Sequence, residues 1–391
     1  MIYFDNAATT LKKPQCVKDA VMNALDSMGN SGRGAYESSL CASRTIYEAR
    51  VALADLFGAP NPNRVIFTSN ATEALNTAIF GLFVEGDHII STDLEHNSVL
   101  RPLYELKNRG CEVDFVPADC EGRIRLANFE SLRKANTKGV VVTHGSNLTG
   151  AVVDVAKIGA WAHENGLLLI VDASQTAGLV PINMGEMNID VLCFTGHKGL
   201  MGPQGTGGIC LSESVDICPL KMGGTGVLSY SETQPDRYPN HLEAGTLNAH
   251  GIAGLLAAVE YIKEVGIEKI YSTEHELYTR FVEGTAKIPG IKIYGGDFRH
   301  LPIVSLNISD IPSSEVSNIL SEKYGVETRS GAHCAPRLHE ALGTKEQGAV
   351  RFSFGFFNTI DEVDCAVKAL EEIAREAIER EKIVREAGNI R

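Results

Sequence analysis

Short apolar, strand-like segments alternate with helical patterns between about residue 49 and residue 211. Strands are predicted at residues 65–68, 87–91, 113–117, 139–144, 167–172, 191–195 and 207–211. Helices are predicted at residues 71–83, 98–109, 128–135 and 154–164, the last beginning at a capping aspartate. This alternation indicates an α/β fold with a mainly parallel, seven-stranded sheet covered by helices on both faces.

The pattern changes after residue 211. A glycine-rich run begins an irregular stretch from Met222 to about Asn248, and a long helical pattern follows at residues 249–265. Short strands at 303–308 and 349–353 precede a charged terminal helix at 361–387, whose apolar positions share one face. We therefore predict a large domain of residues 12–255, and a small α+β domain made of residues 1–11 and 256–391.

Polar residues follow five of the predicted strands. Ligands of such sheets bind beyond the carboxyl ends of the strands, so five polar strand ends together favour a binding site there. The polar segments are residues 68–72, 95–97, 144–147 and 195–198, together with Asp172.

The pair Asp172 and Lys198 suggests the chemistry. Asp172 ends one apolar strand, and Lys198 lies just past the next strand, in a Gly-His-Lys-Gly turn. Pyridoxal phosphate requires such a pair: the lysine amine binds the cofactor covalently, and the carboxylate keeps the pyridine nitrogen protonated. The alternative for Lys198 is an ordinary solvated surface charge.

A phosphate site is predicted where the strand at 65–68 turns into a helix. Free backbone N–H groups and the helix dipole at Ala71 and Thr72 favour an anion there. Thr195, His197 and Thr246 would add donors. An ordinary helix cap explains the Ser and Thr residues equally well.

His96, Asn147 and Gln175 are candidates for contacting the cofactor ring. An imidazole at His96 would stack on the ring and move protons, although a helix-capping histidine is the alternative. The amides of Asn147 and Gln175 suit a phenolic oxygen, and both residues are also common in turns.

The predicted small domain carries a candidate nucleophile, Cys334, in the run Arg-Ser-Gly-Ala-His-Cys. A cationic neighbour lowers the pKa of a thiol and so supplies thiolate, while a passive loop thiol is the alternative. Arg329 and Arg351 bracket the cysteine and suit bidentate binding of a carboxylate. One of the two arginines is also expected to make a salt bridge between the domains.

Composition narrows the class of protein. The 391 residues carry a net charge of −13, which argues against a nucleic-acid partner. The nine cysteines show no paired spacing, which favours a reducing cytoplasm and free thiols, with Cys193 and Cys210 buried. The N-terminus has no signal-peptide pattern, and no run approaches the roughly 20 apolar residues of a membrane span. We predict a soluble, cytoplasmic protein without a metal site.

An ordered set of motifs along nearly the whole chain resembles a known family. The set is similar to the class V aminotransferase-fold cysteine desulfurases and selenocysteine lyases. Its members are residues 3–8, 71–73, 95–96, 146–147, Asp172, Gln175, 196–198, 243–246 and 329–334.

This resemblance implies a fold-type I homodimer with pyridoxal phosphate on Lys198. It places Asp172 at the ring nitrogen, His96 over the ring, and Asn147 and Gln175 near the phenolic oxygen. Thr72, Thr195 and His197 would hold the phosphate together with Thr246 of the other subunit, reached by the crossing segment 223–243. Cys334 would take sulfur from L-cysteine as a persulfide and release L-alanine. Arg351 would hold the substrate carboxylate, with Arg329 nearby.

Loop length suggests the subtype. Cys334 and Arg351 are 17 positions apart, which resembles the group II branch, with its short loop and a separate sulfur-acceptor protein. Ala332 and the run 336–339 fall outside the resemblance, and we expect His339 to lie on a surface loop.

Alternative functions are a selenocysteine lyase acting on L-selenocysteine, an aminotransferase or β-lyase acting on another amino acid, and a non-catalytic scaffold of sulfur assembly. The pathway that would receive the sulfur, iron–sulfur clusters among them, stays open.

Overall fold

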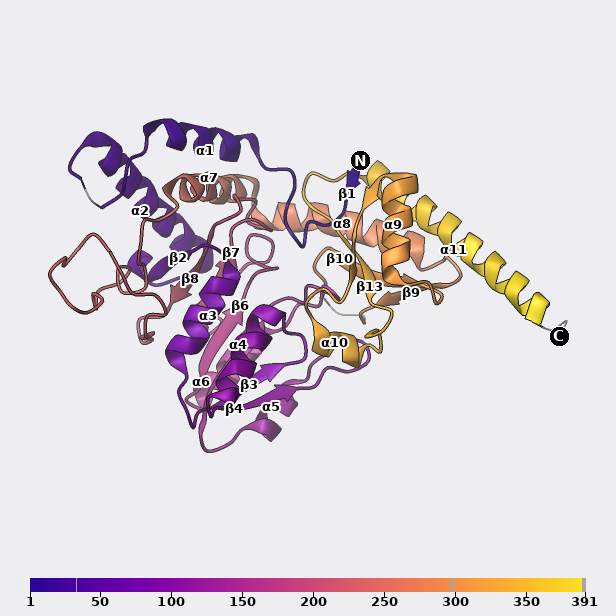
Figure 1. The fold of residues 1–391 in the computed structure, drawn as a ribbon, viewed down its shortest axis with the longest axis horizontal. Helices are drawn as coiled ribbons and strands as arrows, with labels where there is room; N and C mark the ends of the chain where they lie inside the picture. The colour runs from indigo at the N-terminus through magenta and orange to yellow at the C-terminus, as the bar shows by residue number, and fades with distance from the viewer. Residues whose placement is uncertain (33, 297–298, 389–391) are drawn as a thin grey trace.

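The computed structural model describes residues 1–32, 34–296 and 299–388, and the side chains up to residue 380. A seven-stranded sheet lies at the centre of the larger lobe (Figure 1), with strand order β2-β8-β7-β6-β5-β3-β4. Strand β8 is antiparallel to both of its neighbours, and the other pairs are parallel. The strands are β2 (Val65–Thr68), β3 (His88–Thr92), β4 (Glu112–Val116), β5 (Thr137–Thr143), β6 (Leu168–Asp172), β7 (Val191–Thr195) and β8 (Gly207–Leu211). The predicted mainly parallel, seven-stranded sheet is confirmed.

Helices cover both faces of this sheet, so its strands are buried on both sides. Along β7, Leu192 and Phe194 belong to one apolar cluster, while Val191 and Cys193 belong to the other. Cys193 and Cys210 are both fully buried, as predicted. The helices are α3 (Ala71–Leu82), α4 (Asn97–Asn108), α5 (Leu126–Leu132), α6 (Val155–Glu164) and α7 (Ala249–Val265). Asp154 caps α6 by accepting from the Lys157 N–H at 3.2 Å, also as predicted.

Two helices that the apolar pattern does not predict, α1 (Gln15–Ser27) and α2 (Glu37–Phe57), pack against α7. Helix α1 buries Val17 and Ala24, which are too few apolar positions for a clear helical period. The buried face of α2 consists largely of alanines and serine, whose weak hydrophobicity hides the helix. Helix α5 ends three residues before the predicted position, because Arg133 adopts an extended conformation.

A smaller lobe is built on an antiparallel sheet of order β12-β13-β10-β9. The apolar face predicted for the terminal helix is confirmed, since Val363, Leu370 and Ile373 are buried in the core of this lobe. Its elements are β9 (Ile291–Tyr294), β10 (Ile303–Ile308), β12 (Arg329–Gly331), β13 (Ala349–Ser353), α8 (Ile267–Thr285), α9 (Ser313–Tyr324), α10 (Pro336–Ala341) and α11 (Ile360–Gly388). The domain division at residues 12–255 stays a prediction.

The N-terminal segment runs from the smaller lobe to the larger one. Strand β1 (Ile2–Tyr3) pairs in parallel with β11 (Val326–Glu327), and Asp5 forms a bridge with Ser353 of β13. A few residues later, the Thr10 N–H donates to the carbonyl of His197, beyond the end of β7, at 3.1 Å. The first residues of the chain therefore hold the two sheets together.

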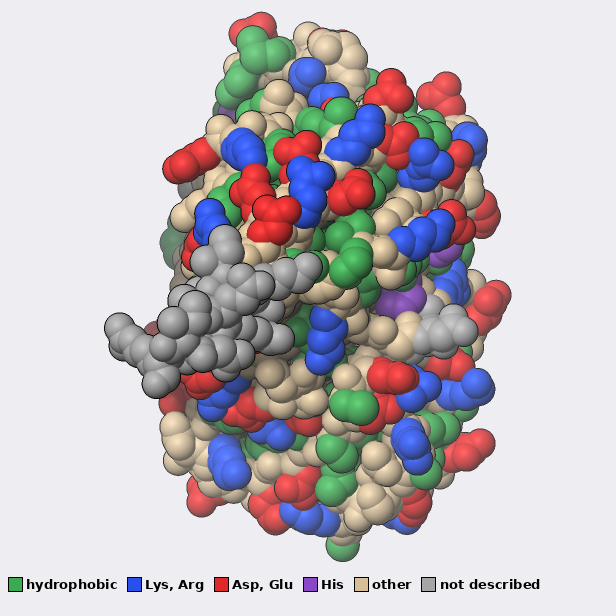
Figure 2. All heavy atoms as spheres, turned by 90° about the vertical axis from the view of Figure 1, so that its right-hand side faces the viewer, with side chains coloured by type: hydrophobic (Ala, Val, Ile, Leu, Met, Phe, Trp, Pro, Cys, Tyr) green, Lys and Arg blue, Asp and Glu red, His purple; other side chains and the backbone are tan. Residues whose placement is uncertain are grey.

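The surface seen in Figure 2 carries acidic and basic side chains interspersed with one another. On this face the acidic excess of the sequence is not gathered into one patch. Among the described residues, the helices are all too short or too polar to cross a membrane.

The chain between β8 and α7 is irregular, as predicted for residues 222–248, and a buried ion pair anchors its end. Both carboxylate oxygens of Glu243 accept from the Arg50 guanidinium of α2, at 2.8 and 2.7 Å. The same carboxylate accepts from the Phe67 N–H of β2 at 2.7 Å. Both side chains are 5% exposed, so removing either one would leave a buried charge without its counter-ion.

We predict that Arg50→Met lowers the free energy of unfolding by about 3–5 kcal/mol, the usual cost of breaking a buried ion pair. The control is Arg44→Met on the same helix, whose partner Glu37 and own side chain are both largely exposed. It should cost at most about 1 kcal/mol. Urea unfolding curves of the two variants compare them directly, and equal losses would contradict the prediction.

Candidate active site

One cavity at the carboxyl ends of the parallel strands brings together nine of the predicted site residues. These are Ala71, Thr72, His96, Asn147, Asp172, Gln175, Thr195, His197 and Lys198. The cavity is also lined by five further residues, of which Asn70 and Gly145 belong to the predicted polar segments: Asn70, Ser98, Thr143, Gly145 and Ser174. All five polar strand ends contribute to its wall, so the predicted convergence is present in the fold.

Lys198 follows β7 and is half-buried in the wall of this cavity. Burial lowers the pKa of its amine to about 8, although the nearby carboxylate of Asp172 acts in the opposite direction. A lowered pKa makes a substantial fraction of the amine neutral, and the neutral amine is the nucleophilic form.

The turn that carries Lys198 is fixed from two sides. Thr10 donates its hydroxyl to the Lys198 carbonyl at 2.7 Å, and Lys13 donates its ammonium to the His197 carbonyl at 2.8 Å. On the other side, a Cβ at Gly199 would lie 2.6 Å from the Ala177 carbonyl oxygen, which glycine alone avoids. This close approach sets the lysine turn against the segment that carries Gln175.

Asp172 lies at the end of β6 and is 3% exposed. Its Oδ1 accepts from the backbone N–H of Ser174 at 2.9 Å and also from the Ser174 hydroxyl. Both donors hold the carboxylate in one orientation.

His96 is both the N-cap of α4 and a lining residue of the cavity. Its Nδ1 accepts from the Ser98 N–H at 3.1 Å, so in the neutral ring the proton sits on Nε2. Burial lowers the pKa of His96 to about 4, so the imidazole is neutral at physiological pH. His96 therefore caps α4 and lines the cavity at the same time, and the capping hydrogen bond fixes its tautomer.

The acid next to His96 in the sequence, Glu95, is fully buried. Burial raises its pKa to about 8, in spite of hydrogen bonds from Thr92 Oγ1 at 2.7 Å and the Thr143 N–H at 3.1 Å. Glu95 is thus mostly protonated at neutral pH and adds little negative charge near Asp172.

The predicted phosphate side lies at the start of α3. Asn70, not Ser69 or Thr72, caps this helix by accepting from the Glu73 N–H at 2.9 Å. The Thr72 hydroxyl instead lies 2.8 Å from that of Ser98. Thr246 is exposed and outside the residues that line the cavity.

His197 and Thr195 line the same cavity. His197 Nδ1 lies 3.0 Å from the Thr9 hydroxyl, and burial lowers the pKa of its ring to about 4. A neutral His197 offers a hydrogen bond to an anion without a full charge.

Cys334 is half-buried, in the turn between β12 and α10. The turn is tied to the cavity, because Asn147 Nδ2 donates to the His333 carbonyl at 2.7 Å and the Asn97 N–H donates to the Cys334 carbonyl at 2.8 Å. Arg329 Nη2 lies 3.8 Å from the sulfur.

The turn is strained at two successive residues. His333 and Cys334 have φ of 48° and 57°, in the left-handed region, which costs a non-glycine residue on the order of 1–3 kcal/mol. Burial holds the pKa of His333 well below its usual value. The cation beside the thiol is therefore Arg329, and His333 is neutral.

The expectation that His339 lies on a surface loop is wrong. His339 belongs to α10, is 2% exposed, and its ring stacks on that of His333 with centroids 5.8 Å apart. Its Nδ1 lies 2.7 Å from the Thr344 hydroxyl. Its burial depends on a stacking partner six residues earlier, which no local pattern reveals.

Arg351 makes a salt bridge with Asp5 of the N-terminal segment, inside the predicted small domain, and not the expected one between the domains. Its Nη2 lies 2.5 Å from Asp5 Oδ1, and its Nη1 donates to the Asn147 carbonyl at 3.0 Å. Its Nε is buried and has no hydrogen-bond partner among the described residues. The Nε–H of Arg351 is thus available to donate a hydrogen bond to another acceptor next to Asn147.

The donor set fits a phosphorylated pyridine aldehyde. It offers a partly neutral lysine amine, an oriented carboxylate, a neutral imidazole and hydroxyl groups at a helix N-terminus. The amine matches the aldehyde carbon, and the carboxylate matches a protonated ring nitrogen. The imidazole matches a ring face, and the hydroxyl groups match a phosphate.

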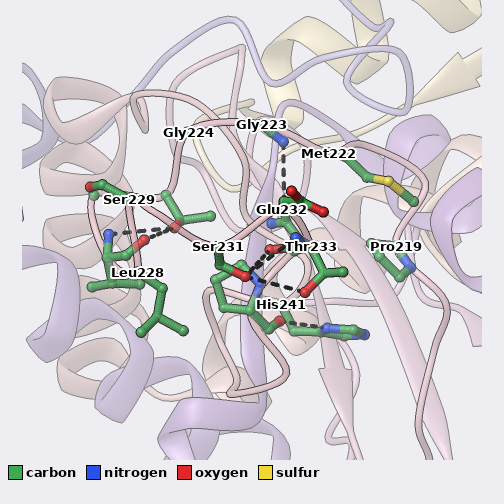
Figure 3. Close-up of a pocket in the computed structure, with 15 residues that line it drawn as sticks. Pro219, Met222, Gly223, Gly224, Leu228, Ser229, Ser231, Glu232, Thr233 and His241 are labelled. Atoms are coloured by element: carbon green, nitrogen blue, oxygen red, sulfur yellow. Dashed lines mark hydrogen bonds between the residues drawn. The ribbon is translucent and has the colours of Figure 1, made fainter.

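A larger cavity, of about 920 Å³, lies in the irregular segment between β8 and α7 (Figure 3). Its walls come from residues 219–235 and His241, and its hydrogen bonds, such as that from the Gly223 N–H to Gln234, stay within the segment. None of the nine residues gathered around Lys198 lines it, so the chemistry belongs to the smaller cavity.

The chain is similar to known proteins over most of its length. The sequence model of the aminotransferase class-V family matches residues 2–365. A protein of Methanothermobacter thermautotrophicus named probable cysteine desulfurase is 36% identical, over 95% of this chain and 94% of its own length. A protein of Haloferax volcanii named cysteine desulfurase is 32% identical, over 95% of this chain and 89% of its own. The solved apo structure of a cysteine desulfurase from Thermococcus onnurineus NA1 superimposes with a TM-score of 0.91 at 34% identity, covering 96% of this chain and 95% of that one.

We predict that covalent capture of pyridoxal phosphate by the cofactor-free protein accelerates as pH rises and levels off above about 8. With a pKa of about 8, about one lysine amine in ten is neutral at pH 7, against fewer than about one in a thousand for an ordinary lysine. Stopped-flow absorbance of the bound cofactor measures the rate, and Lys198→Arg is the control without capture. A rate that keeps rising to pH 10 would contradict the lowered pKa.

Proposed function

The chain belongs to the class-V aminotransferase family, and from this membership we propose that it is a pyridoxal phosphate-dependent cysteine desulfurase. The enzyme converts L-cysteine to L-alanine and keeps the sulfur as a persulfide on Cys334. One observation carries the proposal: Asn147 lines the Lys198 cavity and also donates to the His333 carbonyl at 2.7 Å. The nucleophile is thus tethered to the cofactor cavity.

Bound pyridoxal phosphate supplies an electron sink for the bonds around the substrate α-carbon. In this proposal Lys198 carries the cofactor, Asp172 holds the ring nitrogen protonated, and His96 lies over the ring. Asn147 and Gln175 contact the phenolic oxygen. The phosphate is held by Ala71, Thr72, Thr195 and His197. The neutral state of His96 suits stacking, because a cation would oppose the protonated ring nitrogen.

Protein groups perform the proton and sulfur transfers. Lys198, with its pKa near 8, removes the α-proton of the substrate and later returns a proton to form alanine. The Cys334 thiolate attacks the substrate sulfur, the bond between that sulfur and the β-carbon breaks, and the electron pair stays with the carbon part. The overall change converts cysteine and the Cys334 thiol to alanine and the Cys334 persulfide, without an external oxidant or reductant.

Arg351 is proposed to bind the substrate carboxylate. It lies beside Asn147, and its Nε has no partner among the described residues, so a carboxylate would satisfy a buried donor. Arg329 stays close to the thiol, with its Nη2 3.8 Å from the sulfur.

A homodimer with a shared active site is part of the proposal. Thr246, expected at the phosphate, is exposed in the single chain and would reach the cavity of a second copy. Large exposed hydrophobic side chains are concentrated on two segments, the stretch from Leu11 to Val51 and the loop from Leu220 to Tyr230. An exposed apolar surface of this kind supports burial against a partner.

A separate sulfur-acceptor protein is the proposed destination of the persulfide. The turn that bears Cys334 is short, and hydrogen bonds at both His333 and Cys334 hold it to the larger lobe. An acceptor thiol therefore has to approach the cavity, because the tethered cysteine does not travel. Free thiols throughout the chain suit a reducing cytoplasm.

The test replaces Cys334 with alanine. Cys334→Ala should abolish alanine and sulfide formation from cysteine while leaving the absorbance of the bound cofactor intact. The control is Cys365→Ala, an exposed cysteine on α11, which should behave as the wild type. Amino-acid analysis and mass spectrometry of the persulfide give the readouts, and full activity of Cys334→Ala would exclude the persulfide role.

A further inference from the structure

The run Pro336 to His339, which lies outside the family resemblance, forms the start of α10 directly after Cys334. Within it, Arg337 reaches across to the larger lobe. Its Nε lies 2.7 Å from Asp93 Oδ1, and its guanidinium sits 4.0 Å from the centre of the Phe115 ring. The arginine side chain is 31% exposed and the aspartate 13%, so the pair is largely shielded from water.

Asp93, which binds Arg337, is itself held in place by two hydrogen bonds to backbone groups. Its backbone N–H donates to the Val116 carbonyl at 3.1 Å, and its Oδ2 accepts from the Ala118 N–H at 3.2 Å. Phe115 and Val116 belong to β4, at the edge of the large sheet. Both side chains that Arg337 contacts thus extend from backbone that the sheet holds in place.

The segment that begins at Asp93 also carries two groups of the active site. His96 lines the cavity, and the Asn97 N–H donates to the Cys334 carbonyl at 2.8 Å. One short segment therefore holds the imidazole, the backbone of the nucleophile and, through Arg337, the helix that follows the nucleophile.

The turn between these attachments requires restraint. His333 and Cys334 both have left-handed φ, a conformation that would relax if the chain on either side were free. Strand β12 restrains the turn on its N-terminal side through its pairing with β13. On the C-terminal side, the Arg337 contacts tie α10 to the larger lobe.

We propose that Arg337 is a positioning residue of sulfur transfer: its contacts with Asp93 and Phe115 hold the Cys334 thiol at its reacting distance from the substrate. The inference rests on the proposed cysteine desulfurase function. Arg337 touches neither cofactor nor substrate, so it affects the step in which Cys334 attacks sulfur and leaves the binding of cysteine unchanged. It therefore changes kcat and not KM.

The experiment compares Arg337→Gln with the wild-type holoenzyme. The single-turnover rate of Cys334 persulfide formation should fall by about 10- to 100-fold, the usual effect of misplacing a reacting group by about 1 Å. The cofactor absorbance change on mixing with cysteine, which reports substrate binding, should keep its wild-type rate. Without substrate, iodoacetamide should alkylate Cys334 severalfold faster, as followed by mass spectrometry of its peptide.

Two further variants separate positioning from general stability. Arg337→Lys keeps the charge opposite Asp93 and should recover part of the lost rate. Arg280→Gln breaks an exposed arginine–aspartate pair between α8 and α11, at 2.8 and 3.0 Å from Asp364, and should match the wild type. If Arg337→Gln does not fold, Asp93→Asn tests the same contact from its other end.

The outcomes are distinct. Wild-type persulfide formation in Arg337→Gln, or an equal slowing of the absorbance change and of persulfide formation, would overturn the positioning role. A wild-type enzyme that forms no persulfide from cysteine would instead refute the proposed function.

Discussion

The carboxyl ends of neighbouring parallel strands meet at one edge of a sheet, and the active site depends on that constraint. Asp172 ends β6, Lys198 follows β7, and His96 and Asn147 follow β3 and β5, which are adjacent in the sheet. Residues separated by about a hundred positions in the sequence thus line one cavity. The helices that follow these strands begin at the same edge, so the His96 ring both caps α4 and lines the cavity.

Burial determines the charge of nearly every titratable group in this site. It lowers the pKa of Lys198, His96 and His197, and it raises that of Glu95. Each of these groups is pushed toward its neutral form, although the chain as a whole carries −13. Two arginines in or beside the site form ion pairs: Arg351 with Asp5, and Arg337 with Asp93. A cofactor that carries its own charges therefore meets neutral hydrogen-bonding groups and a few fixed ions.

The sequence predicts the large sheet and its polar strand ends because most of its strands contain a short apolar run followed by a turn. It does not predict α1 and α2, whose buried faces are small or sparse. Thr10, Lys13 and Ser98 are missed for another reason: they act through hydrogen bonds to distant backbone or side chains, which leave no periodic signal. His339 is misplaced because its burial depends on the stacked ring of His333. Element type is encoded locally, whereas the supports of a site are encoded in contacts between remote segments.

The N-terminal segment joins the first residues of the chain to some of the last. Ile2 pairs with Val326, Asp5 with Arg351, and Thr10 with the lysine turn. During synthesis on the ribosome, the first dozen residues emerge long before residues 326–351 exist. Strand β1 therefore has no partner strand while the larger sheet forms. The lysine turn receives its final support only after residues 326–351 have been made, so a chain truncated before them would lack a finished site even with every strand of the large sheet in place.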